Sequence, residues 1–171
     1  MVSASANAAK PANRPAEARV RELLAEVFDP EIPVLNVIEM GIVRSIVCSD
    51  EAVHILITPT YSGCPAMETI EQDIRAALAH GGFDQVDINT VLSPAWTTDW
   101  LSEAARAKLR EHGIAPPSGA ACISSPQQTE VACPRCGSHD TEELSAFGST
   151  ACQALRRCRA CREPFGYFKA I

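Results

Sequence analysis

Four cysteines near the C-terminus have the spacing of metal ligands. They form two C-x-x-C pairs, Cys133-Pro-Arg-Cys136 and Cys158-Arg-Ala-Cys161, which are separated by 21 residues. Each pair can form a tight turn, and two such turns supply four thiolates in the tetrahedron that suits Zn²⁺. A short segment with few large apolar side chains also needs such a cross-link to fold. We therefore predict a structural zinc ion with four ligands: Cys133, Cys136, Cys158 and Cys161.

Two other interpretations of these four cysteines stay open at this stage. Iron, as a rubredoxin-type centre or a cluster, also accepts a tetrahedron of sulfur ligands. Two unrelated redox-active C-x-x-C motifs would have the same spacing within each pair. Pairing of the motifs within one small segment favours a single metal site over two redox motifs.

A fifth cysteine, Cys64, stands where a strand pattern stops and a helix pattern begins. It lies between Gly63 and Pro65. At the start of a helix the positive end of the macrodipole favours the thiolate, the form that reacts and binds metals. A packed, inert thiol is an equally good interpretation, because free cysteine is among the most buried residue types. A Cys–His hydrolase is disfavoured, since no histidine is tied to Cys64 by its place in the sequence.

Two carboxylates, Asp29 and Glu31, occupy a loop that its prolines restrict. Such a pair can bind a metal or act as acid and base, although a solvated helix end is the commoner case. Three cysteines remain outside these groups. We expect Cys48 to be packed at a strand end, and Cys122 and Cys152 to be unliganded thiols, although Cys152 is close in sequence to the second C-x-x-C pair.

Hydrophobic periodicity predicts the elements that hold these residues. We expect helices over 17–28, from Pro65 to Gly81, and from Ser102 to Gly113. Strands are expected over 42–48, 53–58 and 86–92, with a turn at 49–51. The fold class is therefore α+β: a small mixed sheet with helices packed on one face, followed by a C-terminal zinc β-ribbon.

Composition changes along the chain suggest its domains. We predict a disordered tail over 1–16, an α+β domain over 17–114, a linker over 115–129 and a four-cysteine zinc ribbon over 130–171.

Composition also narrows the class of protein. The net charge is −6 without a basic stripe, which argues against nucleic-acid partners. No signal peptide or membrane span is evident, so the eight cysteines indicate a reducing, cytoplasmic compartment.

Two stretches resemble a known domain. "DPEIPVLNVIEMGIVRSI" and "ITPTYSGCPAME" resemble the small domain of proteins that assist iron–sulfur cluster assembly. "SPAWTTDWLSEAARAKLREHGIAPP" and "FGSTACQALRRCRACREPFGYFKAI" are similar to the D subunits of bacterial phenylacetyl-CoA epoxidase systems, and this resemblance runs from Glu17 to Ile171. The chain departs from it at Ala170, where many relatives are expected to have a cysteine.

This resemblance implies an accessory role in phenylacetate catabolism rather than a catalytic one. In such systems a diiron oxygenase subunit forms the epoxide, and a reductase with a flavin and a [2Fe–2S] cluster supplies electrons. The D subunit would help these iron or iron–sulfur centres to form, with the oxygenase and reductase subunits and the iron–sulfur assembly machinery as partners. Cys64 would be a transient iron or cluster ligand, and Asp29 and Glu31 would supply nearby oxygen atoms. The alternative is a structural or regulatory subunit that stays bound to the oxygenase.

Overall fold

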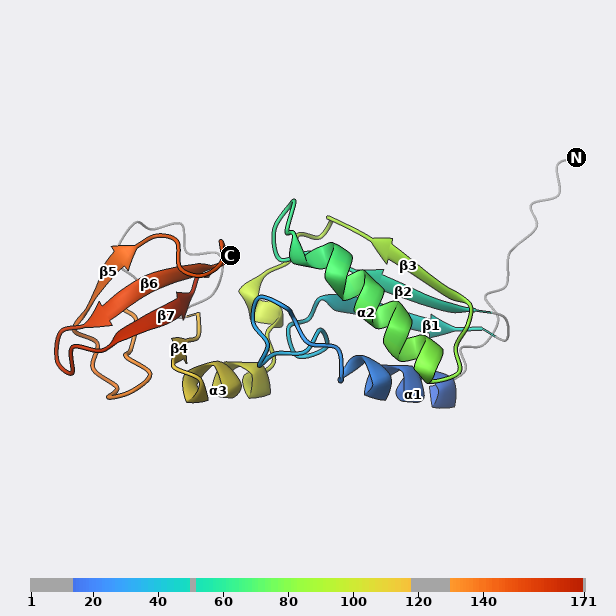
Figure 1. Cartoon of the computed structure of the whole chain (residues 1–171), viewed down its shortest axis with the longest axis horizontal. Coiled ribbons are helices and arrows are strands. Elements are labelled where there is room, and N and C mark those ends of the chain that lie inside the picture. The colour runs from blue at the N-terminus through green and yellow to red at the C-terminus, as the bar shows by residue number, and fades with distance from the viewer. Residues whose placement is uncertain (1–13, 50–51, 118–129, 171) are drawn as a thin grey trace, which may run out of the picture.

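The chain forms two sheets that lie side by side (Figure 1). The structure is a computed structural model and describes residues 14–49, 52–117 and 130–170. The first sheet has the strand order β1-β2-β3, and the second has the order β4-β7-β6-β5. Two sheets with helices confirm the α+β class and the C-terminal ribbon.

The elements follow the predicted order of helix, strand, strand, helix, strand and helix through the first part of the chain. The helices are α1 (Arg14–Leu24), α2 (Ala66–His80) and α3 (Glu103–Glu111), with a short 3-10 helix at Thr98–Trp100. The strands are β1 (Val43–Cys48), β2 (Val53–Ile57), β3 (Val86–Thr90), β4 (Ile114–Ala115), β5 (Thr141–Ser145), β6 (Gln153–Cys158) and β7 (Pro164–Phe168).

Several boundaries differ from the sequence-based expectation; β3, for example, ends at Thr90 rather than at Leu92. Helix α1 begins at Arg14, inside the expected tail, and ends at Leu24 rather than at Phe28, because Phe28 forms an isolated bridge with Asn36. Ala115, the first residue of the expected linker, lies in β4. Residues 1–13 and 118–129 of the expected tail and linker, two residues of the expected 49–51 turn, and Cys122 lie outside the described residues.

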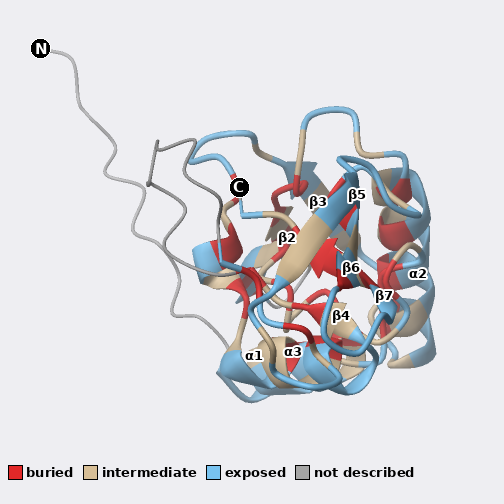
Figure 2. Ribbon diagram, turned by 90° about the vertical axis from the view of Figure 1, so that its left-hand side faces the viewer, coloured by how far each residue is buried: buried red, intermediate tan, exposed pale blue. Residues whose placement is uncertain are grey.

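The first sheet has one covered face. Val53, Ile55 and Ile57 of β2 are buried, whereas His54 between them is exposed. Helix α2 connects β2 to the parallel strand β3 and buries Ile70, Ile74 and Leu78, which lie on one side of a helix at this spacing. Buried residues gather between the sheet and its helices (Figure 2).

The second sheet is joined to the first part of the chain at one end. Strand β4 follows α3 directly and pairs in parallel with β7. At the end of β7, Phe168 is fully buried in the same apolar cluster as the first sheet, and its ring lies 6.1 Å from that of Trp96. Trp96 is itself held by a 2.9 Å hydrogen bond from Nε1 to the carbonyl of Met40. The ribbon is therefore packed against the first domain.

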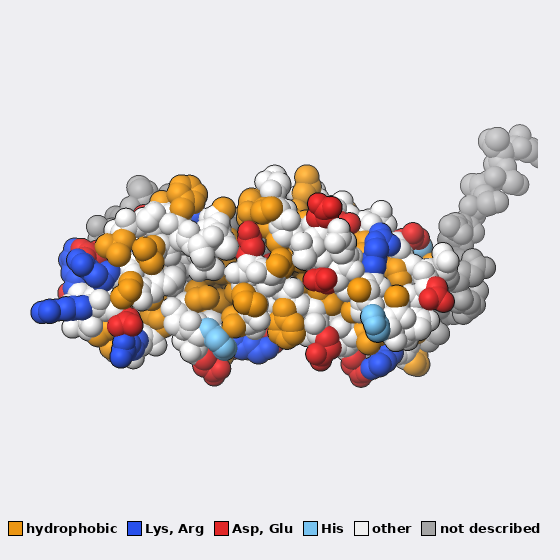
Figure 3. Space-filling model, viewed as in Figure 1, with side chains coloured by type: hydrophobic (Ala, Val, Ile, Leu, Met, Phe, Trp, Pro, Cys, Tyr) orange, Lys and Arg blue, Asp and Glu red, His pale blue; other side chains and the backbone are white. Residues whose placement is uncertain are grey.

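The surface is mixed in character. Acidic, basic and apolar side chains are interspersed on the face in Figure 3, with basic side chains gathered at the far end of the ribbon. Among the described residues, none of the helices has the length and apolar composition needed to cross a membrane.

We predict that Phe168→Ala will destabilise the first domain, although Phe168 lies in the ribbon. Truncating a buried phenylalanine costs about 3–5 kcal/mol of unfolding free energy. Denaturant unfolding followed by the fluorescence of the two tryptophans reports on this domain, because Trp96 contacts Phe168. The matched control is Phe147→Ala, whose side chain is 67% exposed and should cost less than about 1 kcal/mol. Equal effects of the two variants would contradict this packing.

Candidate metal sites

The four ribbon cysteines meet at the end of the second sheet that is farther from the first domain. The Sγ atoms of Cys133 and Cys161 are 3.8 Å apart, those of Cys136 and Cys158 are 3.5 Å apart, and all four lie within 4.8 Å of one another. A tetrahedron with metal–sulfur bonds of about 2.3 Å has edges of about 3.8 Å. The four sulfurs are therefore close enough to hold one metal ion.

The two C-x-x-C turns share one backbone feature. The residue after each pair is left-handed: Gly137 has φ 74° and Arg162 has φ 64°. In the first turn the N–H of Gly137 donates to the carbonyl of Cys133 at 2.9 Å. In the second turn the N–H of Cys161 donates to Cys158 Sγ at 3.5 Å, which lowers the pKa of the Cys158 thiol to about 7. Metals bind the thiolate, so this geometry favours the ligand form.

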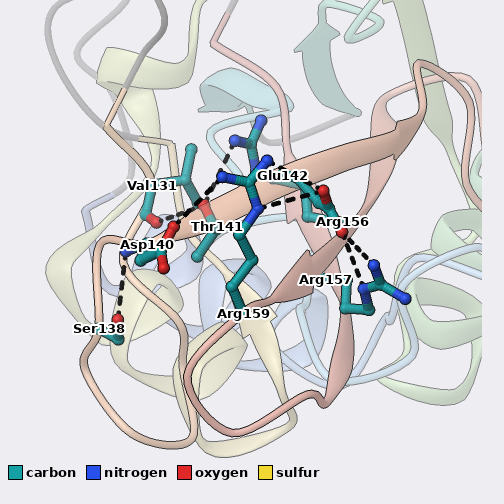
Figure 4. Close-up of polar contacts among 8 residues, drawn as sticks. All are labelled: Val131, Ser138, Asp140, Thr141, Glu142, Arg156, Arg157 and Arg159. Carbon is teal, nitrogen blue, oxygen red and sulfur yellow. Dashed lines mark hydrogen bonds and ion pairs between the residues drawn. The ribbon is translucent and has the colours of Figure 1, made fainter.

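Polar contacts connect the second C-x-x-C turn to strand β5 (Figure 4). Glu142 accepts hydrogen bonds from Arg157 and Arg159, and these hold the pKa of its carboxyl below the usual value. The N–H of Arg159 also donates to the carbonyl of Asp140 at 2.9 Å. Thr141 donates through Oγ1 to the carbonyl of Val131 at 3.0 Å. These contacts position both cysteine pairs relative to the sheet.

Cys64 lies in a tight turn that leads into α2. Gly63, with φ 82°, allows the reversal, and the N–H of Cys64 donates to the carbonyl of Tyr61 at 3.2 Å. The N–H of Met67 donates to the carbonyl of Cys64 at 3.3 Å, so the helix begins immediately after the cysteine. The Cys64 side chain is partly buried and packs against the apolar core. The predicted position at a helix start is correct.

Asp29 shapes the loop between α1 and β1. Its side chain is 4% exposed, so it is not a solvated helix end. Oδ1 accepts hydrogen bonds from the N–H groups of Glu31 at 2.7 Å and Ile32 at 2.9 Å. Burial raises the pKa of Asp29 and outweighs the opposing effect of these two hydrogen bonds. Burial and the charge of Asp29 together raise the pKa of Glu31.

Tyr61 connects the carboxylate loop to the Cys64 turn. The pKa of Tyr61 is raised to about 12, and burial is the largest cause. The charge of the Cys64 thiol and its hydrogen bond with the Tyr61 hydroxyl raise this pKa further, as do the charges of Glu31 and Cys152. Sequence reasoning placed Asp29, Glu31 and Cys64 on one surface through a family resemblance, and these interactions join Glu31 and Cys64 through Tyr61. It did not assign a role there to Tyr61 or Cys152. The sequence could have pointed to Tyr61, because it lies close to Cys64 in the chain, but nothing in the sequence linked Cys152 to these residues.

This second group of residues is more open than the ribbon site. Within the described part of the chain, only the four ribbon cysteines form a group of three or more potential ligands close enough to hold one ion. Asp29, Glu31 and Cys64 therefore do not form such a group.

Fold and sites together define a class of protein in which an iron–sulfur assembly-type domain precedes a four-cysteine ribbon. Residues 17–89 match the family model described as "Iron-sulfur cluster assembly protein", and residues 118–169 match "PaaD zinc beta ribbon domain". The chain is 52% identical, over 87% of its length and 90% of the other protein, to the putative D subunit of the 1,2-phenylacetyl-CoA epoxidase of Escherichia coli (strain K12). The chain therefore belongs to the family of phenylacetyl-CoA epoxidase D subunits.

Two further comparisons concern the first domain alone. A "Fe-S protein maturation auxiliary factor" of Porphyromonas gingivalis is 35% identical over 54% of this chain and 90% of that protein. The crystal structure of a domain of unknown function, DUF59, from Bacillus anthracis aligns with a TM-score of 0.54 at 24% identity. It covers 56% of this chain and 92% of that one, which establishes the shared fold.

The ribbon geometry predicts one tightly bound metal ion per chain. Cys158→Ser should abolish this binding and weaken the ribbon, because the binding free energy contributes directly to folding. Elemental analysis after dialysis measures the ion, with Cys48→Ser as a control that also removes a buried thiol. Metal-free wild-type protein, or equal metal in the Cys158→Ser variant, would refute the prediction.

The Asp29 environment predicts a pH-dependent effect of Asp29→Asn. A raised folded-state pKa means that the native state disfavours the ionised carboxyl, so stability is lost as pH rises through the range between the unfolded and folded pKa values. Asparagine keeps Oδ1 but cannot ionise. The free energy of unfolding of Asp29→Asn minus that of wild type should therefore be larger at about pH 7 than at about pH 4.

Denaturant unfolding at the two pH values tests this expectation. The control is Asp29→Ala, which loses both backbone hydrogen bonds and should cost about 1–3 kcal/mol at each pH. If the stability of Asp29→Asn relative to wild type does not rise with pH, then burial does not determine the pKa of the Asp29 carboxyl.

Proposed function

We propose that this protein is an accessory factor that helps to assemble the iron or iron–sulfur centres of a phenylacetyl-CoA epoxidase, and that it does not catalyse the epoxidation. The observation that carries the proposal is the position of Cys64 in the turn before α2, where Tyr61 interacts electrostatically with both Cys64 and Glu31. It lies in the domain that matches iron–sulfur assembly proteins. Family membership supplies the enzyme system to be served.

The chemistry of the donors supports a transient iron site. A thiolate favours iron or zinc over magnesium and calcium, whereas carboxylates are harder ligands that bind many divalent ions. Cys64 stands two residues before the first residue of α2 and is only partly buried. Three donors that are not drawn together around one point would bind iron less firmly than a closed tetrahedron. Iron here is cargo to be passed on.

The ribbon site has the opposite character, and we assign it a structural zinc ion. Its four sulfurs lie within 4.8 Å of one another, and a site closed by four thiolates has no open position for a substrate or a transferred ligand. The match to a zinc β-ribbon favours zinc over iron in this site. The four ribbon cysteines would thus hold the fold, while Cys64 handles the cargo.

The partners in this proposal are the oxygenase and reductase subunits of the epoxidase, together with the iron–sulfur assembly machinery. Support comes from the names of two relatives, one an epoxidase component and the other a maturation factor. A role that requires reduced thiols also fits the cytoplasm.

The proposal is tested by producing the epoxidase subunits under three conditions. They are made together with this protein, together with its Cys64→Ser variant, or with neither. Iron per oxygenase and per reductase subunit is the measurement. We expect Cys64→Ser to lower iron occupancy as far as omission of the protein does, because the transfer ligand is lost. Cys48→Ser should support normal occupancy.

Full iron occupancy with Cys64→Ser would refute the cargo role. If the protein also remained in stoichiometric amounts in the purified epoxidase, the alternative of a structural or regulatory subunit would replace it. A maturation factor should instead be substoichiometric in the finished complex.

A further inference from the structure

A groove lies where the ribbon meets the loop between α1 and β1. Its larger part is a cavity of about 490 Å³, which is within the size range of ligand pockets. Three segments line this cavity: the loop, the turn between α3 and β4, and strands β6 and β7. In Figure 1 the loop, drawn in blue, lies on the side of the first domain that faces the ribbon. Docking of the ribbon onto the first domain therefore forms this groove.

The groove continues past the beginning of β7. A second hollow, of about 400 Å³, extends to Pro134 beside the first cysteine pair. The two hollows share four lining residues: His112, Gly113, Pro164 and Phe165. An elongated groove of this kind fits an extended peptide better than it fits a compact small molecule.

One part of the lining is an apolar surface that is open to a ligand. Leu155 of β6 is 38% exposed, although Ala154 before it is buried. Val34 and Ile114 line the same cavity. An apolar side chain placed in the groove would remove the exposed surface of Leu155 from water.

A buried amide, that of Gln153, also faces the groove. Gln153 is 5% exposed and lines the cavity, and its Oε1 lies 2.8 Å from the position that a Cβ on Gly166 would take. Its backbone N–H and carbonyl are bonded to Thr150 and Gly148. Its side-chain amide has no hydrogen-bond partner among the described residues. Buried polar groups are normally paired, and a side-chain amide can both donate to and accept from a peptide group.

Glu31 is the uncompensated charge of the groove. It is partly buried, lines the cavity, and makes no ion pair within the described part of the chain. Burial and the charge of Asp29 raise the pKa of Glu31, and a nearby cation would offset this cost of its ionised form. The arginines of the second hollow, Arg110 and Arg135, are already paired with glutamates. Charge in the groove therefore favours a basic ligand.

We propose that this groove binds an extended segment of a partner protein in which a lysine or arginine lies two residues from an apolar residue. Residues two apart in an extended chain point to the same side. The basic side chain pairs with Glu31, the apolar side chain covers Leu155, and a backbone peptide group exchanges hydrogen bonds with the Gln153 amide. This surface goes beyond the function proposed above, because it binds a partner whether or not Cys64 carries iron.

A positional-scanning library of blocked peptides, measured by fluorescence anisotropy with the full-length, zinc-loaded protein, tests the proposal. The library should select lysine or arginine two positions from an apolar residue. Glu31→Gln should weaken binding of a selected peptide at least about tenfold, and so should glutamine in place of the basic residue of the peptide. The two changes together should weaken binding no further than either alone. Glu26→Gln, which removes an exposed carboxylate, should match wild type.

The amide and the apolar surface are tested separately. Gln153→Met removes the donor and the acceptor, and Leu155→Ser removes the exposed apolar side chain. Each should weaken peptide binding by about threefold to tenfold. Leu144→Ser is the control, because Leu144 is 49% exposed on β5 and belongs to neither set of lining residues.

A measurement on the wild-type protein does not depend on folding of a variant. Addition of the selected peptide should shift the nuclear magnetic resonance signals of the Gln153 side-chain amide. Unchanged signals at saturation would contradict the proposed contact. A library without preference for basic residues, or equal binding by wild type and Glu31→Gln, would overturn the groove as a peptide site. Each of these failures leaves the cargo role of Cys64 intact, since that role is measured by iron occupancy.

Discussion

The contact between Trp96 and Phe168 determines how the two parts of this protein are combined. The Trp96 ring is held by its hydrogen bond to the Met40 carbonyl, and Phe168 is fully buried against it at the end of β7. Exposing so large an apolar side chain costs about 2–3 kcal/mol, so the ribbon cannot be treated as an independent module. Parallel pairing of β4 with β7 continues this attachment through the backbone.

This attachment gives the two ends of the second sheet different chemistry. The far end holds four sulfurs within 4.8 Å of one another, beside a framework of hydrogen bonds and ion pairs. The near end contributes a single cysteine, Cys152, to a junction that already contains carboxylates and a thiol from the first domain. Retention of an ion requires the closed geometry, whereas transfer requires ligands that can separate.

The features that could be predicted from residue order alone are local ones. The spacing of Cys133, Cys136, Cys158 and Cys161 was sufficient to predict that they converge, because each pair forms its own turn. Strand β2 and helix α2 were predicted correctly, since each pattern follows from backbone geometry within a few residues. Cys64 was placed correctly at the start of α2 for the same reason. The zinc, iron and domain assignments that rest on these patterns are predictions.

The meeting of distant segments became visible only in three dimensions. Helix α1 ends early because Phe28 pairs with Asn36 across a loop, and Asp29 is buried by that loop although its sequence is typical of an exposed helix end. The position of Cys152 depends on the docking of Phe168 and on the length of β6, not on its neighbours in sequence. Periodicity describes one element at a time, whereas burial depends on how complementary apolar surfaces from separate elements fit together. The convergence of the four ribbon cysteines was therefore predictable, and the burial of Asp29 and Cys152 was not.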